Sequence, residues 1–237
     1  MVAVPGKVRD GRQARWTKHN EARKAQIINA AIAVLEDAEP GTEFHVQQIA
    51  ERAGLNRTVV YRHFADRADL DRAIQAEIVD GIAALLLPQV TLDGTVHQII
   101  GRIVTTYVEW VVEHPALHRF AEVDSSDPMQ QGIARIAEVL VELLTTAIEL
   151  LRAELAEDER AALDPLAHGL VGAVLGAVRR WVVREDQEPE AHRLADLLAE
   201  SVWYLLDGHA RRLGVDLDPD VPVEELLAEA AAVEAVP

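Results

Sequence analysis

The sequence predicts an all-α fold, and three observations support that prediction. Apolar residues recur at intervals of three and four over long segments, which is the period of a helix with one buried face. The 13 Gly and 10 Pro of the 237 residues lie mostly at the ends of those segments, where helices stop. Hydrophobic residues make up 49% of the chain and aromatic residues only 4%, which indicates a sizeable core of Leu, Val, Ile and Ala.

The first 16 residues differ from the rest in composition. Pro5, Gly6 and Gly11 stand among scattered Arg with few apolar residues, so we expect a disordered basic arm over residues 1–16. The whole chain has a net charge of −17, but its excess of acidic residues lies in residues 81–237. A basic arm before an acidic body is compatible with a polyanionic partner such as DNA, and an ordinary unstructured tail is the alternative.

A first helix is expected over residues 17–38, followed by two short helices over residues 45–64. Val46, Ile49, Ala50 and Ala53 form one apolar stripe on the first short helix. Gly54 can end that helix because it tolerates positive φ, and Asn56 can cap the second. Two short helices joined by a tight Gly-containing turn make a helix-turn-helix, which presents its second helix to the DNA major groove.

The same stretch resembles the DNA-binding region of TetR-family transcriptional repressors over roughly residues 20–80. The resemblance is carried by Ile49-Ala50, Ala53-Gly54, Val60-Tyr61-Arg62-His63-Phe64, and then Arg67 and Leu70. His45 stands where the family usually has a Ser or Thr cap, Val59 where a phosphate-contacting Thr or Ser is common, and Arg67 where Lys is usual. The resemblance implies a three-helix DNA-binding domain over residues 17–80. Its candidate DNA-binding residues are Gln47, Arg57, Thr58, Tyr61, Arg62, His63 and Arg67.

These candidates have distinct expected roles. Arg57 and Thr58 open the second helix, the end that meets base edges, and an arginine there can make a bidentate contact to guanine. Arg67 begins the next helix, where its charge would add to a helix N-terminus that already attracts phosphate. Any one of them is also explained as a solvated helix residue, but the set shares one face and favours DNA.

A helix capped by Asp66 is expected over residues 67–87 and leads into a second helical domain, residues 81–221. Periodicity predicts further helices over residues 92–114, 115–121, 129–155, 164–184 and 190–213. Residues 222–237 form a C-terminal tail that adds at most one marginal amphipathic helix.

By the family resemblance, the second domain binds an effector and forms a homodimer through its last two long helices. Candidate ligand-binding residues are Arg102, Tyr107, Trp110, Phe120, Leu140, Leu144 and Trp181. Their mainly apolar character suits a small hydrophobic effector. Candidate dimer-interface residues are Gly172, Gly176, Leu198, Val202 and Leu205. Plain packing within one subunit is the alternative for both sets. Two copies related by a twofold axis would read a palindromic operator.

Several other functions are not expected from this sequence. The absence of Cys excludes disulfides and Cys-ligated zinc. His114, His118 and Glu122 recur every four residues, but Pro115 breaks their shared face, so no metal site is expected. No catalytic triad, phosphate loop or clustered carboxylate pair appears, so we expect neither an enzyme nor a cofactor.

Two features of the sequence indicate where the protein acts. The N-terminus has no apolar signal segment, and we expect the apolar stretches around Leu85 and Val174 to be far shorter than the ~18 residues that span a membrane. We therefore expect a cytoplasmic regulator, a repressor by family resemblance, with no membrane partner. The alternative is a helical ligand-binding or enzymatic protein whose helix-turn-helix is vestigial.

Overall fold

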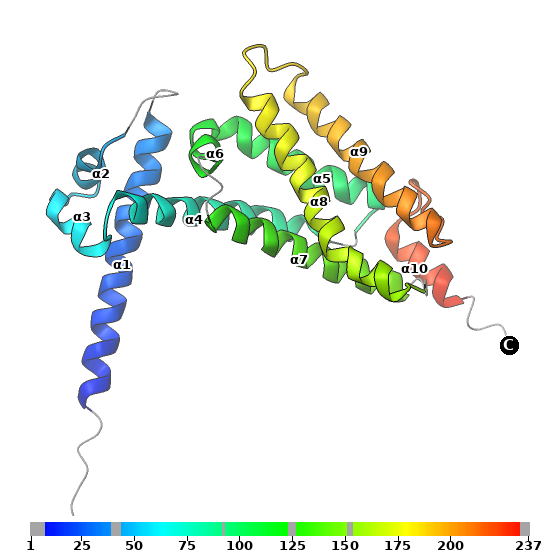
Figure 1. Cartoon of the computed structure of the whole chain (residues 1–237), viewed down its shortest axis with the longest axis horizontal. Coiled ribbons are helices and arrows are strands. Elements are labelled where there is room, and N and C mark those ends of the chain that lie inside the picture. The colour runs from blue at the N-terminus through cyan, green and yellow to red at the C-terminus, as the bar shows by residue number, and fades with distance from the viewer. Residues whose placement is uncertain (1–7, 39–43, 92, 123–126, 151–153, 233–237) are drawn as a thin grey trace, which may run out of the picture. The chain divides into compact units, whose positions relative to one another are not determined.

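The structure, a computed structural model, describes residues 8–38, 44–91, 93–122, 127–150 and 154–232 (Figure 1). Those residues form ten α-helices and one short 3₁₀ helix, and they contain no β-strand beyond an isolated bridge between Thr95 and Pro222. The all-α prediction is therefore confirmed. The helices are α1 (Val8–Asp37), α2 (Val46–Arg52), α3 (Arg57–His63), α4 (Arg67–Leu86), α5 (Val96–Glu113), α6 (Pro115–Glu122), α7 (Asp127–Leu150), α8 (Glu157–Val182), α9 (Ala191–Arg212) and α10 (Val223–Ala232).

The helices group into two compact units. Unit 1 comprises Met1–Ile78 with Ala116–Pro128, and unit 2 comprises Val79–Pro115 with Met129–Pro237. Helix α4 contributes its residues up to Ile78 to unit 1 and the remainder to unit 2. From the sequence we expected a division between residues 80 and 81, without the return of residues 116–128 to the N-terminal unit.

Unit 1 is built on the apolar stripes of its helices. The fully buried side chains Ile27, Ile49, Val60, Leu70 and Ile74 come from α1, α2, α3 and α4 in turn. Helix α6 joins this unit because the ring of Phe120 meets that of Phe44 edge-on, with centroids 5.4 Å apart. The Gln75 side chain of α4 also donates a hydrogen bond to the Phe120 carbonyl at 3.2 Å.

Helix α1 is longer than the sequence predicted. Residues 8–16, for which we expected disorder, continue the helix that braces the helix-turn-helix, while residues 1–7 lie outside the described residues. Extending an existing helix adds one hydrogen bond per residue without a new nucleation step, and Arg, Gln and Ala are good helix formers. These two effects outweigh the glycine at position 11.

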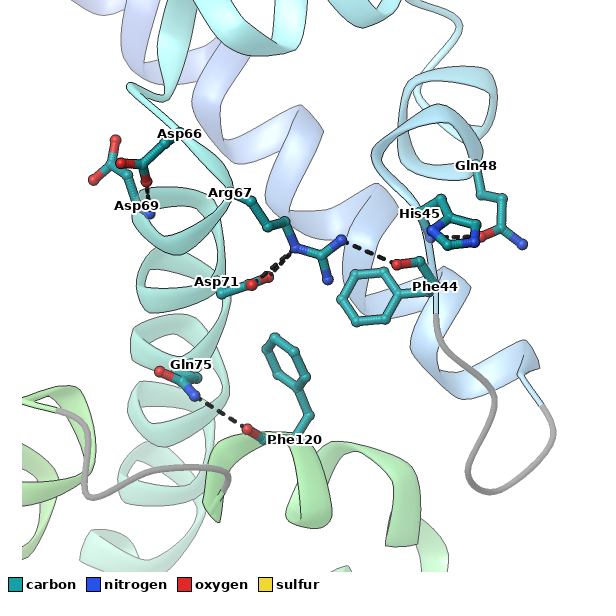
Figure 2. A network of polar contacts seen from close by, with 9 residues as sticks. All are labelled: Phe44, His45, Gln48, Asp66, Arg67, Asp69, Asp71, Gln75 and Phe120. Atoms are coloured by element: carbon teal, nitrogen blue, oxygen red, sulfur yellow. Dashed lines mark hydrogen bonds and ion pairs between the residues drawn. The ribbon is translucent and has the colours of Figure 1, made fainter.

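Side-chain caps set the beginnings of α4 and α5. The Asp69 N–H donates to the Asp66 carboxylate at 2.7 Å, and the Asp69 carboxylate accepts from the Ala65 N–H at 2.9 Å, which confirms the predicted cap (Figure 2). At α5, Thr95 and Gln98 cap each other's backbone N–H groups at 3.2 and 3.0 Å. This box begins α5 at Val96 rather than at the expected residue 92.

The core of unit 2 lies where α5 and α9 pack along each other. Val108 and Val111 of α5, Val178 and Trp181 of α8, and Trp203 of α9 are buried together. The Trp181 indole N–H donates to the carbonyls of Gln187 and Pro189, both at 2.8 Å, and so fixes the connection from α8 to α9.

The later helices differ from their expected bounds. Helix α8 begins at Glu157 instead of residue 164 and passes through Pro165. Three acidic residues in its first turn favour the earlier start, and Glu159 accepts the Ala156 N–H at 3.1 Å. Helix α7 starts two residues early and ends by Leu150, beyond which residues 151–153 lie outside the described residues. Helix α1 ends at Asp37, close to the expected residue 38, and residues 39–43 lie outside the described residues.

Helix α8 is more apolar than the sequence reading recognised. An 18-residue window within it has the length and composition of a membrane span, yet only 17% of that window is buried within the chain. The polar residues Asp164 and His168 lie within this helix, but the mean hydropathy of the window remains that of a membrane span. The expectation that all apolar stretches are too short was therefore wrong for α8, and most of that window is exposed or half-buried in the single chain.

Candidate nucleic-acid interface

Helices α2 and α3 form the predicted helix-turn-helix. Gly54 ends α2 with φ of +65°, a conformation that glycine adopts without steric cost. The N–H of Leu55 then reaches the carbonyl of Ala50 at 2.8 Å, and the N–H of Gly54 reaches that of Glu51 at 3.0 Å. These two bonds close the end of α2. The apolar stripe of α2 and the Val60 side chain of α3 are buried, as the sequence predicted.

The start of α3 is exposed and polar. Asn56 occupies the cap position, but its side chain makes no capping hydrogen bond, contrary to the sequence-based expectation. Arg57 and Thr58 are both exposed in the first turn. The Arg57 guanidinium lies over the Tyr61 ring, 5.5 Å from its centroid, and Tyr61 is itself 38% exposed. The ring thus holds the arginine against α3 while leaving its N–H groups able to reach a ligand.

Two further candidates flank this start. Gln47, at the beginning of α2, is exposed and donates to Glu51 at 2.7 Å. His63 is half-buried at the end of α3, and no described residue hydrogen-bonds its buried Nδ1. Burial lowers the pKa of His63, and the nearby cations Arg23, Lys24, His19 and Arg62 lower it further. These cations come from α1 as well as α3, so the two helices share one positive field.

Arg67 has a role within unit 1 that the sequence did not indicate. Figure 2 shows its guanidinium directed toward Asp71 and the Phe44 backbone. It donates to the Asp71 carboxylate at 2.7 Å and to the Phe44 carbonyl at 3.0 Å, and it lies 4.3 Å from the Phe44 ring centroid. In the free protein Arg67 therefore ties α4 to the segment before α2.

The charges of unit 1 are segregated. Arg52 pairs with Asp37 at 2.7 Å, Arg67 with Asp71 at 2.7 Å, and Arg72 with Asp69 at 3.6 Å. By contrast, five cations on α1 and α3 form no ion pair with any described residue: Lys18, Arg23, Lys24, Arg57 and Arg62. Arg23 and Lys24 were missed in the sequence reading, which assigned α1 only a bracing role. The sequence feature that could have identified them is their position just before Ile27, where the apolar stripe of α1 begins.

The structure does not gather the seven ligand-binding candidates around one site. Tyr107 and Trp181 are buried in the core of unit 2, and Trp110 packs half-buried against it. Leu140 and Leu144 are half-buried on α7, and Arg102 donates to the Asp93 carbonyl and the Thr91 hydroxyl, both at 2.9 Å. Phe120 belongs to unit 1, where it faces Phe44. Helical periodicity gave no information on which neighbour α6 packs against.

A half-open cavity of about 360 Å³ lies in unit 2 near the turn between α8 and α9. Its walls are Val111, Val112, Pro115, Trp181, Val182, Gln187, Glu190 and Ala191. Of the predicted ligand-binding residues only Trp181 lines it. The lining is mainly apolar, with one carboxylate and one amide.

The candidate dimer residues lie on a surface of unit 2 that is open in the single chain. Gly172 and Gly176 on α8 are exposed, and a Cβ at either position would meet no atom within 4 Å. On α9, Leu205 is 49% exposed and Tyr204 61%, while Leu198 and Val202 are half-buried against the core. Among the described residues no group of three metal-ligating side chains is present, and His118 pairs with Glu122 at 3.7 Å within α6.

Comparisons with known proteins agree with this geometry. Residues 27–74 match the family model "Bacterial regulatory proteins, tetR family". The HTH-type transcriptional regulator Rv0472c of Mycobacterium tuberculosis is 27% identical over 204 residues, which cover 84% of this chain and 83% of that protein.

Solved structures share the fold. A tetR-family transcriptional regulator from Streptomyces coelicolor superposes with a TM-score of 0.61 at 20% identity, covering 91% of this chain and 98% of its own. The transcriptional regulator FadR from Bacillus subtilis, solved with stearoyl-CoA, superposes with a TM-score of 0.56 at 18% identity, covering 75% and 96%. With the helix-turn-helix in place and the family model matched across it, residues 27–74 form a TetR-family DNA-binding domain, which makes the chain a helix-turn-helix transcriptional regulator.

Proposed function

We propose that the protein is a repressor that binds a palindromic operator as a homodimer through α3 and is released by a small hydrophobic effector. The observation that carries this proposal is the set of unneutralised cations on the exposed face of α3 and the adjoining part of α1. Cations that no carboxylate neutralises suit a polyanion, and Arg57 stands where a recognition helix meets base edges. A cytoplasmic location goes with that partner.

The DNA test uses a duplex selected by the wild-type protein from a random-sequence pool, with binding followed by fluorescence anisotropy at fixed salt. Arg57→Ala should reduce the preference for the selected duplex over random duplex by about 5- to 150-fold, the range for losing one bidentate base contact. Arg52→Ala is the matched control, because Arg52 is already paired with Asp37. A wild-type protein that does not prefer the selected duplex over random duplex would refute the proposal. An Arg57→Ala protein with undiminished preference would show that another residue reads the bases.

The dimer is assigned to α8 and α9. The exposed apolar window of α8, its surface glycines and the exposed Leu205 form a face that a second copy would cover. Surface glycines let two helices approach closely. In sedimentation experiments the wild type should be a dimer and Gly176→Leu a monomer, since a Leu there fits the open face of one chain but obstructs a second. Equal masses would contradict this assignment.

The effector is proposed to bind in unit 2. The cavity beside Trp181 lies at the small end of the range for drug-sized ligands and has mainly apolar walls. FadR from Bacillus subtilis, a relative in fold, was solved with stearoyl-CoA, which makes fatty acids and acyl-CoA compounds the first panel to screen. An effector releases DNA only if it binds more tightly to a dimer geometry that the operator disfavours. A compound from the panel should therefore raise the melting temperature and lower DNA affinity together, and Trp181→Ala should weaken both effects.

A further inference from the structure

Between positions 17 and 37, α1 carries fully buried side chains only from Ile27 onward, and every side chain from position 17 to position 26 is exposed or half-buried. The Gln26 side chain donates to the Ala53 carbonyl at 2.8 Å and so braces the end of α2. The helix nevertheless continues back to Val8.

Basic residues recur along one face of the N-terminal half of α1. Positions 9, 12, 15, 19 and 23 are separated by three or four residues, the spacing that keeps residues on one side of an α-helix. Their occupants, Arg9, Arg12, Arg15, His19 and Arg23, are here called the basic row. By the same helical period, the two acidic residues of this stretch, Asp10 and Glu21, fall on the opposite side.

The C-terminal end of the basic row meets the recognition helix. His19 and Arg23, with the neighbouring Lys24, lie close enough to His63 at the end of α3 to lower its pKa. The Lys24 ammonium also lies 5.5 Å from the ring centroid of Phe64, the residue that ends α3. The Arg23 guanidinium donates only to Gln26 on its own helix, at 2.8 Å. The positive charges of α3 thus continue onto α1 around His63.

We propose that the basic row and Lys24 bind the phosphate backbone of duplex DNA that flanks the half-site read by α3. The proposal rests on the DNA-binding function proposed above and extends its footprint. From Arg9 to Arg23 the row covers about 21 Å at 1.5 Å per residue. One DNA strand carries a phosphate about every 3.4 Å along the helix axis, so the row matches roughly six base pairs of flanking duplex. Such contacts add affinity without sequence preference.

The test compares two double variants of the full-length protein with equal loss of charge. Arg23→Gln/Lys24→Gln removes two unpaired cations, and Arg52→Gln/Arg72→Gln removes two that already pair with carboxylates in the same unit. Gln keeps the helix propensity of Arg and Lys. The probe is the selected duplex, either trimmed to its palindrome or extended by ten base pairs on each side. Affinity is measured across the range from 50 to 200 mM salt.

Each phosphate contact contributes about 0.9 to the slope of log affinity against log salt. On the extended duplex, Arg23→Gln/Lys24→Gln should therefore lower the slope by about 1.8, equivalent to about 12-fold less affinity loss over that salt range. The control pair should leave the slope unchanged. Both selected and random extended duplexes should be affected equally, in contrast to Arg57→Ala.

The outer part of the row, nearer the N-terminus of α1, gives a second measurement. Arg12→Gln/Arg15→Gln should lower the slope on the extended duplex and leave the trimmed duplex unaffected. If both row variants keep the wild-type slope on the extended duplex, the proposal is overturned. That outcome is distinct from failure of the DNA-binding function, in which the wild type itself would prefer no duplex.

Discussion

A close approach between α7 and α4 in unit 2 makes Gly132→Ala an informative substitution. A Cβ at Gly132 of α7 would overlap the Cγ1 of Val79 on α4 and stand 3.5 Å from its Cβ. Val79 is 6% exposed, and a β-branched side chain in a helix has one strongly preferred rotamer, so it cannot turn aside cheaply. Arg135 and Asp80 form an ion pair at the same crossing, which holds the two helices together.

The net effect is the difference between two opposing contributions. Overpacking a filled site costs about 1–3 kcal/mol, whereas replacing glycine by alanine inside a helix gains about 1 kcal/mol. Because the overlap with Val79 is deep, we expect the upper part of the first range and a net destabilisation of about 1–2 kcal/mol. For a chain of this size that lowers the melting temperature by about 2–8 °C.

The assay is thermal unfolding at one fixed protein concentration, because dimer formation makes the melting temperature concentration-dependent. Gly81→Ala is the matched control: Gly81 lies on α4, and a Cβ there meets nothing within 4 Å, so this variant should be stabilised. Val79→Ala removes the obstructing methyl group. The double variant Val79→Ala/Gly132→Ala should therefore be no less stable than Val79→Ala alone. A Gly132→Ala protein that melts above the wild type would refute the reasoning.

Two other perturbations address unit 1. Phe120→Ala removes the edge-on ring contact with Phe44 and should cost about 1–3 kcal/mol in chemical denaturation, with unchanged stability contradicting the assignment of α6 to this unit. The pKa of His63 is lowered in the folded protein, so between that pKa and 6.5 the unfolded chain binds more protons and stability falls as the pH falls. The wild type should lose more unfolding free energy than His63→Gln on going from about pH 7 to 5.5; parallel pH curves would contradict this.

The parts of the fold that sequence reasoning captured are those determined by neighbours in the chain. The stripe Val46, Ile49 and Ala50, the positive φ of Gly54 and the Asp66 cap each depend on residues within one or two turns. Local spacing therefore predicted the helix-turn-helix and the start of α4. The same spacing could not set where α1 and α8 begin, because helix ends depend on small differences in propagation energy.

Local sequence patterns could not predict contacts between segments that are distant in the chain. Phe120 has the periodicity of a core residue, but only the folded chain shows its ring against Phe44 instead of beside Tyr107 and Trp181. Arg67 was expected to face DNA because it begins a helix, and its partner Asp71 lies only one turn away. A carboxylate one turn from an arginine is common on any solvated helix, so this spacing alone does not rank that pairing above a phosphate contact.

The charge balance of residues 1–80 illustrates why composition underestimates a binding surface. Those residues hold twelve basic and twelve acidic side chains, a net charge of zero that by itself argues for no polyanion. The fold separates the two signs, since Arg52, Arg67 and Arg72 are each paired with an aspartate away from the exposed face of α3. The aspartates thereby neutralise the cations outside the interface and leave those of α1 and α3 uncompensated. Local segregation, and not net charge, determines the field that a DNA phosphate meets at distances below the Debye length of about 8 Å in physiological salt.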